Sequence, residues 1–267
     1  MTGTRRVALV TGAARGIGAA TVRALCADGY AVVALDGCAG DGPGRGPGVD
    51  YPLASRAELE ALGARCPGQV VTRVADVRDA DALRAAAAAA VEEFGRLDAA
   101  VAAAAVICGG LPVWETPPEQ VRTLWEVDVM GVWNTAAACV PHMLSGPDPA
   151  GCRFVAVASA AGTRGLFHLA GYGAAKHAVV GLVRGLAADL VNTGVTAVAV
   201  SPGSTRTAML DATAALYDVG TETFAGSQLD GRLIEPEEVA DVVAFCCSRP
   251  GGVANGTVVS AEGGFRG

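Results

Sequence analysis

Short runs of apolar residues, many of them β-branched, alternate along the chain with longer segments in which apolar residues recur every three or four positions. The first pattern is typical of strands buried on both faces, and the second of amphipathic helices. Because helical segments separate the strands, we expect an α/β fold with a doubly wound parallel sheet and helices on both faces. The seven predicted strands cover residues 6–10, 31–35, 70–74, 97–105, 154–158, 195–200 and 256–260.

Glycine and proline interrupt this alternation at one unusual place. Residues 37–55 are rich in both and show neither period, so we expect an ordered or partly mobile insertion there. Residues 206–233 are predicted to be helical and mobile, within a substrate lid at 204–233. With no second domain or internal repeat, residues 1–267 should form a single domain. One further helix is predicted to follow the glycine-rich loop after the first strand and to end at residue 27. The others cover residues 56–64, 79–94, 117–144, about 171–192 and 236–247.

The first strand leads directly into Thr11-Gly-Ala-Ala-Arg-Gly-Ile-Gly18 and then into a helix. In this order Gly12 allows a tight turn, Gly16 lets the backbone approach a pyrophosphate, and Gly18 lets helix and strand pack closely. The phosphates would then lie at the helix N-terminus, where free N–H groups favour anions. The pattern predicts a dinucleotide-binding Rossmann fold.

The second strand ends at Asp36, eighteen residues after Gly18. A carboxylate there can accept hydrogen bonds from the adenosine ribose and would repel a 2′-phosphate, which favours NAD over NADP. Arg15 could reach a phosphate, but Gly37 supplies no second cation. We therefore predict NAD as the cofactor, with NADP as the less favoured alternative.

Tyr172 and Lys176 lie four residues apart in a predicted helix, so their side chains share one face. A phenol ionises near pH ~10, which is too high for a base at neutral pH. A neighbouring ammonium favours the phenolate, so Lys176 should lower the pKa of Tyr172. An isolated Tyr-x-x-x-Lys match is also compatible with an ordinary amphipathic helix.

The charge balance argues against nucleic-acid binding, because 20 basic and 27 acidic residues give −7 without a basic stretch. No apolar run approaches a membrane span and no signal-peptide pattern begins the chain, so we expect a cytoplasmic protein. The eight cysteines form no C-x-x-C pair and there are three histidines. We therefore predict free thiols and no metal site.

Taken together, these motifs resemble the short-chain dehydrogenase/reductase family, in its single-domain branch, over nearly the whole chain. Ser159 precedes Tyr172 by thirteen residues, which is the spacing of that family's catalytic pair. Three segments are similar to a subgroup of the family that is associated with the redox cofactor mycofactocin. They are the insertion, which ends with Tyr51-Pro52-Leu53, and the stretches at 201–209 and 231–233. That subgroup includes carveol-type alcohol dehydrogenases, which implies tightly held NAD and a mycofactocin-type electron acceptor.

The resemblance implies a role for each matching residue. Tyr172 is the general acid/base, Lys176 binds the nicotinamide ribose, and Ser159 polarises the substrate oxygen. Asp76 and Val77 should flank the adenine, and Thr207 should contact the nicotinamide carboxamide. The implied cofactor-binding residues are Gly12, Arg15, Gly16, Ile17, Gly18, Asp36, Asp76, Val77, Ala103, Ala104, Tyr172, Lys176, Pro202, Gly203, Thr205 and Thr207.

Two positions depart from the family pattern. The family has Asn-Asn-Ala-Gly at the end of the fourth strand, where this chain has four alanines at 102–105. The family's fourth catalytic position, an Asn that helps hold a water near the Lys, aligns with Asp128. A carboxylate there can still bind that water, but it could also form a competing ion pair with Lys176. We expect activity to survive with an altered pH profile.

The predicted substrate pocket is mostly apolar, which favours a hydrophobic secondary alcohol or ketone such as a terpenoid or alicyclic compound. Its candidate residues are Leu111, Trp114, Phe167, His168, Met209, Leu210, Leu216, Tyr217 and Phe224. Trp125 and Trp133 are read as core or interface residues, with a homotetramer expected from the family. Two alternatives to an NAD-dependent alcohol dehydrogenase stay open. They are an NADPH-preferring carbonyl reductase of the same fold and a non-catalytic NAD-binding protein.

Overall fold

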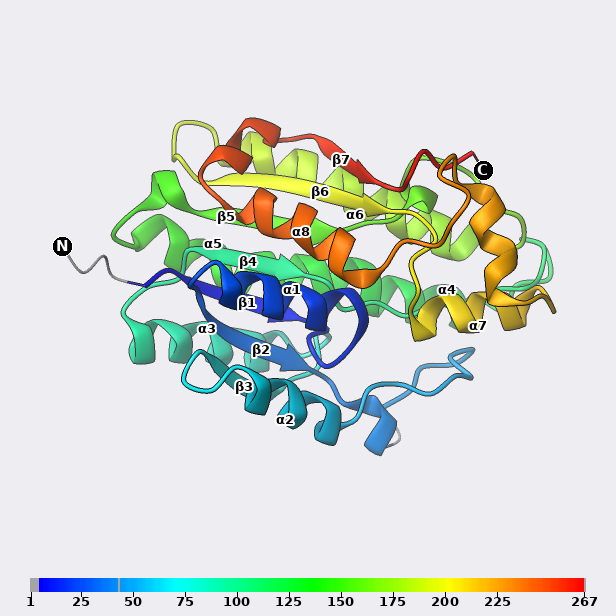
Figure 1. The fold of residues 1–267 in the computed structure, drawn as a ribbon, viewed down its shortest axis with the longest axis horizontal. Coiled ribbons are helices and arrows are strands. Elements are labelled where there is room, and N and C mark those ends of the chain that lie inside the picture. Colours follow the sequence, from blue (N-terminus) through cyan, green and yellow to red (C-terminus); the bar gives the residue numbers. More distant parts are fainter. Residues whose placement is uncertain (1–4, 43, 267) are drawn as a thin grey trace.

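The computed structural model describes residues 5–42 and 44–266, which contain one seven-stranded sheet (Figure 1). Residues 1–4, 43 and 267, which fall within the predicted domain and its insertion, lie outside these ranges. The strands are β1 (Val7–Thr11), β2 (Ala31–Asp36), β3 (Val70–Val74), β4 (Ala99–Ala102), β5 (Arg153–Val157), β6 (Thr196–Pro202) and β7 (Val258–Ala261). Every pair is parallel, in the order β3-β2-β1-β4-β5-β6-β7, so the predicted fold class is confirmed.

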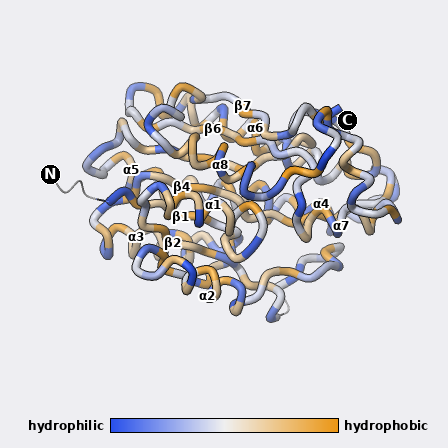
Figure 2. The backbone as a smooth tube through the Cα atoms, in the orientation of Figure 1, coloured by the Kyte–Doolittle hydropathy of each residue, from blue (hydrophilic) through white to orange (hydrophobic). Residues whose placement is uncertain are grey.

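Alternate residues of each central strand pack into two separate cores. From β1, Val7 and Leu9 point to one face, and Ala8 and Val10 to the other. Because both faces are buried, the strands are apolar throughout, and they form the hydrophobic centre of Figure 2. One face is covered by α3 (Ala80–Phe94), α5 (Met130–Ser145) and α6 (Ala170–Asp189), and the other by α1 (Gly16–Ala27), α2 (Arg56–Arg65) and α8 (Pro236–Cys247).

Two predicted elements have different bounds in the structure. Strand β4 ends at Ala102 rather than 105, because the chain then leaves the sheet. The predicted helix at 117–144 is divided into α4 (Pro118–Leu124), a π-helical turn at Trp125–Val129 and α5. Such wide turns often occur at functional sites, and this one contains Asp128.

The segment at 206–233 is helical only in part. It contains α7 (Ala208–Leu216) and a 3₁₀ turn at Thr221–Ser227, and the remainder is irregular. The described part of the insertion, residues 37–42 and 44–55, is irregular apart from a 3₁₀ turn at Ala39–Asp41. In Figure 1 it leaves the end of β2 and extends below α4 and α7.

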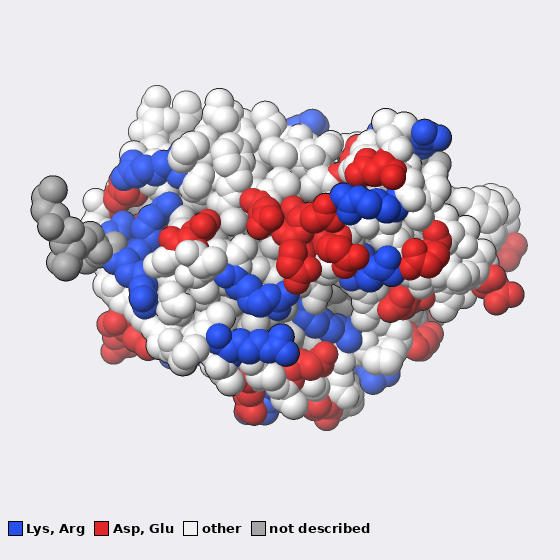
Figure 3. Space-filling model, viewed as in Figure 1, with Lys and Arg blue, Asp and Glu red and all other residues white. Residues whose placement is uncertain are grey.

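The strand order reverses direction between β1 and β4, and at such a point the carboxyl ends of the strands leave a crevice for a ligand. None of the helices formed by the described residues has the length and apolar character that a bilayer crossing requires. On the face seen in Figure 3, acidic side chains gather near the centre, over α8, and basic side chains lie beside and below them.

Candidate active site

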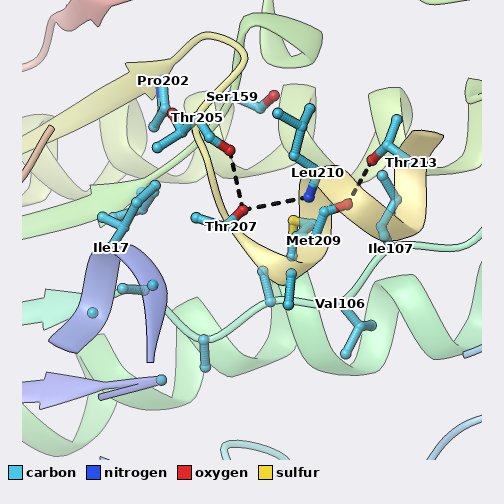
Figure 4. Close-up of a pocket in the computed structure, with 18 of the residues that line it drawn as sticks. Ile17, Val106, Ile107, Ser159, Pro202, Thr205, Thr207, Met209, Leu210 and Thr213 are labelled. Carbon is cyan, nitrogen blue, oxygen red and sulfur yellow. Dashed lines mark hydrogen bonds between the residues drawn. The ribbon is translucent and has the colours of Figure 1, made fainter. Parts of the chain in front are cut away.

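A cavity of about 980 Å³ lies at the carboxyl ends of the strands. Its walls come from the glycine loop, the segments that follow β4, β5 and β6, helix α7 and the insertion. Figure 4 shows Thr207 near Ile17 of the glycine loop, with the start of α7 beyond it. The Thr207 hydroxyl donates to the carbonyl of Thr205 (3.2 Å) and accepts from the amide of Leu210 (3.4 Å), so it caps α7 at the edge of the cavity.

The three predicted glycines occupy positions that exclude a side chain for different reasons. Gly12 has a φ of +65°, and a Cβ there would lie 2.7 Å from the backbone of Ala104. A Cβ at Gly18 would lie 2.0 Å from the carbonyl oxygen of Gly12. Gly16 has a φ of +57° and faces Thr207 across the cavity, where a Cβ would come within 3.4 Å of the threonine methyl. The loop therefore offers bare backbone to a ligand at the start of α1.

Asp36 lies at the end of β2 and is held by backbone amides. Its Oδ2 accepts from the amide of Ala14 (3.1 Å) and its Oδ1 from that of Cys38 (2.9 Å). The guanidinium of Arg15 donates to the carbonyl of Pro52 in the insertion at 2.5 Å. Arg15 therefore anchors the insertion to the glycine loop.

Arg78 is a cavity residue that the sequence reasoning missed. Its guanidinium binds both carboxylate oxygens of Asp76, at 2.5 and 3.0 Å, and also donates to the carbonyl of Gly44 at 2.9 Å. Burial raises the pKa of Asp76, but hydrogen bonds from Arg78 outweigh it and leave the pKa below its usual value. Asp76 and Val77 do line the cavity. The sequence signal that could have identified Arg78 as a cavity residue is its position two residues after Asp76.

Tyr172 and Lys176 project from α6 into the cavity and are 7% and 2% exposed. The Nζ atom of Lys176 lies 5.5 Å from the centre of the Tyr172 ring. Ser159 caps the 3₁₀ turn after β5, where its hydroxyl accepts from the amide of Ala161 (3.1 Å), and it lines the same cavity as Tyr172. Three groups capable of proton transfer thus converge on one wall.

The pKa of Tyr172 is raised above its ordinary value, chiefly by burial. The positive charge of Lys176 and the nearby Ser159 hydroxyl lower it, and the charge of Asp128 raises it further. Lys176 therefore lowers the pKa of Tyr172, as predicted, but burial raises that pKa by more.

Asp128 is fully buried and forms the competing ion pair that the sequence suggested. Its Oδ2 lies 3.2 Å from Nζ of Lys176, and its Oδ1 accepts from the amide of Val106 at 2.9 Å. Burial raises the pKa of Asp128 above its ordinary value and outweighs Lys176 and the Val106 amide, both of which lower it. Burial lowers the pKa of Lys176, but Asp128 and Tyr172 outweigh it, so the lysine remains an ammonium.

The end of β4 is stabilised without the family's asparagine. The Thr11 hydroxyl accepts from the amides of Ala103 (3.2 Å) and Ala104 (3.4 Å), both of which line the cavity. The alanines at 102–105 thus lack the side-chain hydrogen bonds of the family's asparagine, but the backbone of this segment stays hydrogen-bonded to β1. Their small side chains also suit the close approach of Gly12.

Most of the cavity lining is apolar. Pro202, Gly203, Thr205 and the predicted pocket residues Phe167, Met209, Leu210, Tyr217 and Phe224 line the cavity, together with Tyr51, Ile107, Leu166 and Leu169, which were not predicted as pocket residues. Among the described residues, Trp114, His168, Leu111 and Leu216 are not in its lining. Trp114 is 82% exposed, and the His168 ring stacks on Phe167 at 3.7 Å.

Every basic side chain that the structure describes in the cavity wall has a partner. Arg23 pairs with Glu237, and Arg206 with Glu222 and Glu235. Arg15, Arg78 and Lys176 have the partners given above. Among residues 5–42 and 44–266, no cluster of three or more His, Cys, Asp or Glu side chains could hold a metal ion.

These features define a dinucleotide crevice that opens onto an apolar pocket, and the comparisons with known proteins agree. The family model described as enoyl-(acyl carrier protein) reductase matches residues 48–266. An uncharacterised NAD-dependent oxidoreductase of Mycobacterium tuberculosis is 34% identical over 97% of this chain and 95% of its own length. The chain belongs to the short-chain dehydrogenase/reductase family.

Two further relatives have more specific names. The cis-4-hydroxycyclohexanecarboxylate dehydrogenase of Sinomonas cyclohexanicum is 36% identical, over 97% of this chain and 96% of its own. A crystal structure of carveol dehydrogenase from Mycobacterium avium in complex with NAD superposes with a TM-score of 0.88 at 28% identity, covering 97% of this chain and 96% of that one. The relatives thus include dehydrogenases named for cyclic alcohols.

Proposed function

We propose that this protein is an NAD-dependent oxidoreductase that transfers hydride between NAD and a neutral, hydrophobic secondary alcohol or its ketone. The convergence of Ser159, Tyr172 and Lys176 on one wall of the crevice carries the proposal. A hydroxyl, a phenol and an ammonium together can hold an alcohol oxygen and move its proton.

The residues present fit a dinucleotide. Bare backbone at Gly12 and Gly16 suits the pyrophosphate at the start of α1, and Asp36 suits the adenosine ribose. The engagement of Arg15 with Pro52 weighs against NADP, because that guanidinium already has a partner. When bound, NAD supplies the nicotinamide ring that exchanges hydride with the carbinol carbon.

The proton moves through the protein's own groups. In alcohol oxidation the Tyr172 phenolate oxygen takes the hydroxyl proton, while the Ser159 hydroxyl holds the substrate oxygen. The Lys176 ammonium favours the phenolate against the effect of burial. Asp128 keeps Lys176 charged and in place, at an ion-pair distance of 3.2 Å. In ketone reduction Tyr172 returns the proton.

The cofactor is held tightly, as the resemblance to the mycofactocin-associated subgroup implies. Contacts from Arg15 to Pro52 and from Arg78 to Gly44 support this, since they tie the insertion across the adenosine end of the crevice. An enzyme that retains its NADH needs a second electron acceptor, and a mycofactocin-type carrier meets that need.

The substrate is neutral. Four of the five described cations in the cavity wall are paired with carboxylates, and the fifth, Arg15, binds a carbonyl of the insertion beside the glycine loop. A substrate carboxylate at the apolar end would therefore be buried without a counter-ion of its own, at a cost of several kcal/mol. The relative named for cis-4-hydroxycyclohexanecarboxylate acts on such an acid. The apolar lining instead favours an alicyclic or terpenoid alcohol such as carveol, after which other relatives are named.

The active form is a homotetramer. Trp125 and Trp133, on the outer side of the π turn and α5, are 48% and 59% exposed, so they are not core residues of the chain. Large apolar side chains exposed together on a helix surface indicate a protein interface.

The first test is native mass spectrometry of the purified protein for NAD, followed by an alcohol screen with an artificial dye as the electron acceptor. We expect bound NAD and turnover of neutral cyclic alcohols. Co-purified NADP would favour the carbonyl-reductase alternative. Bound NAD without turnover of any alcohol in a broad panel would favour the non-catalytic alternative and refute the proposal.

A further inference from the structure

Tyr51 belongs to the insertion but reaches the catalytic end of the crevice. Its ring packs against the apolar cluster that contains Tyr172 and Leu169. Its hydroxyl accepts a hydrogen bond from the backbone amide of Ile107 at 3.2 Å. The insertion thus contacts the loop after β4 as well as the adenosine end.

The amide next to Ile107 is held by the catalytic machinery. The Val106 amide donates to Oδ1 of Asp128 at 2.9 Å, while the other oxygen of Asp128 lies 3.2 Å from Nζ of Lys176. Oδ2 has that ammonium contact alone. Two consecutive amides are therefore fixed by two different groups, one from the insertion and one from the buried ion pair.

This arrangement links the insertion to Lys176 in few steps. A displacement of the 106–107 backbone would change the hydrogen bond at Asp128, and hence the position and charge of the carboxylate. Only small displacements are needed, because a hydrogen bond weakens steeply as its geometry departs from the optimum.

We propose that Tyr51 is a positioning residue for proton transfer, fixing the 106–107 loop so that Asp128 and Lys176 hold their places beside Tyr172. This inference rests on the proposed function of those residues. It gives the insertion a second role, because the segment that contacts the adenosine end of the crevice through Arg15 and Arg78 then also fixes the catalytic geometry.

The hydroxyl of Tyr51 can be removed without releasing the insertion. Arg15 binds the carbonyl of Pro52 at 2.5 Å, and Arg78 binds that of Gly44 at 2.9 Å. Neither contact involves the Tyr51 side chain. Tyr51→Phe keeps the ring and its packing and removes only the acceptor for Ile107.

The main experiment compares Tyr51→Phe with the wild type in alcohol oxidation. We expect kcat to fall between about threefold and tenfold, the effect of one lost hydrogen bond, with KM and the bound NAD content unchanged.

We also expect the rising limb of the pH–rate profile to move to lower pH by about half a unit. The Val106 amide helps to keep Asp128 ionised, and its loss weakens the repulsion that opposes ionisation of Tyr172. The ionisable groups that face Asp128 are Lys176, Tyr172, Tyr51 and Cys108.

A matched control is Tyr30→Phe. Tyr30 is also buried, and its hydroxyl donates to the carbonyl of Cys247 at 3.0 Å, away from the crevice. This variant should lose stability without a change in the pH–rate profile. Equal changes in both variants, or none in Tyr51→Phe, would overturn the proposed role of Tyr51.

A second readout does not depend on turnover. Hydrogen exchange at the Val106 and Ile107 amides should become at least about tenfold faster in Tyr51→Phe and not in Tyr30→Phe. Unchanged exchange at Val106 would refute the coupling to Asp128. If the wild type turned over no alcohol, the proposed function would fail, and exchange at Val106 would still decide whether Tyr51 is coupled to Asp128.

Discussion

Replacement of Asp128 by Asn tests how the buried carboxylate sets the pH dependence of catalysis. Asn keeps the size of the side chain and an oxygen that can accept from the Val106 amide, but removes the negative charge. Asp128 lies 3.2 Å from Nζ of Lys176, and Nζ lies 5.5 Å from the centre of the Tyr172 ring. The charge of Asp128 therefore acts on Tyr172 at short range.

With about 3 Å from the ring centre to the phenol oxygen, these two distances limit the separation of the two charges to about 12 Å, where like charges repel by at least about 1.4 kcal/mol at an effective dielectric constant of about 20. A pKa difference of one unit corresponds to about 1.4 kcal/mol. The repulsion raises the pKa of Tyr172, and its removal lowers that pKa. The rising limb of alcohol oxidation, which follows ionisation of Tyr172, should move to lower pH by at least about one unit.

The assay is kcat and kcat/KM for alcohol oxidation, measured at pH values on both sides of the rising limb in the wild type and in the variant. Asp98→Asn provides the control, because Asp98 is equally buried, pairs with Arg96 and accepts from the Val7 amide, outside the crevice. It should lower the melting temperature and leave the profile in place. Superimposable profiles for wild type and Asp128→Asn would show that the reasoning about this charge is wrong.

Three further changes test other parts of the site. Tyr172→Phe should lower kcat by about a thousandfold or more while NAD content, read by native mass spectrometry, is retained; turnover near the wild-type rate would remove Tyr172 from the mechanism. Gly18→Ala places a Cβ 2.0 Å from the Gly12 carbonyl and should destabilise the protein by about 3 kcal/mol in thermal unfolding, whereas Gly181→Ala, with open space around it, should not. Trp133→Glu should dissociate the tetramer in size-exclusion chromatography, whereas the similarly exposed Val191→Glu should leave it intact; a wild-type monomer would contradict the interface.

The pattern of strands and helices determined the architecture, because strands buried on both faces must be apolar throughout and amphipathic helices must cover them. The glycine loop could be found for a related reason. A bare backbone is required at Gly12, Gly16 and Gly18, and only glycine provides it. Tyr172 and Lys176 followed from helical spacing, since four residues place two side chains on one face.

Contacts between distant segments could not be read in the same way. The sequence allowed Asp128 either to bind water or to pair with Lys176, and the pairing depends on a π turn that no local pattern announces. The engagement of Arg15 and Arg78 by insertion carbonyls likewise depends on where an irregular segment returns to the crevice.

Local propensity and periodicity thus determined the sheet, its helices, the glycine loop and the Tyr172–Lys176 pair, because each depends on residues a few positions apart. Tertiary structure decided which charges pair, which aromatic residues line the cavity and how Tyr51 meets the loop after β4. These outcomes depend on burial and on contacts between residues far apart in the chain, where desolvation and charge compete and the balance changes over distances of an ångström.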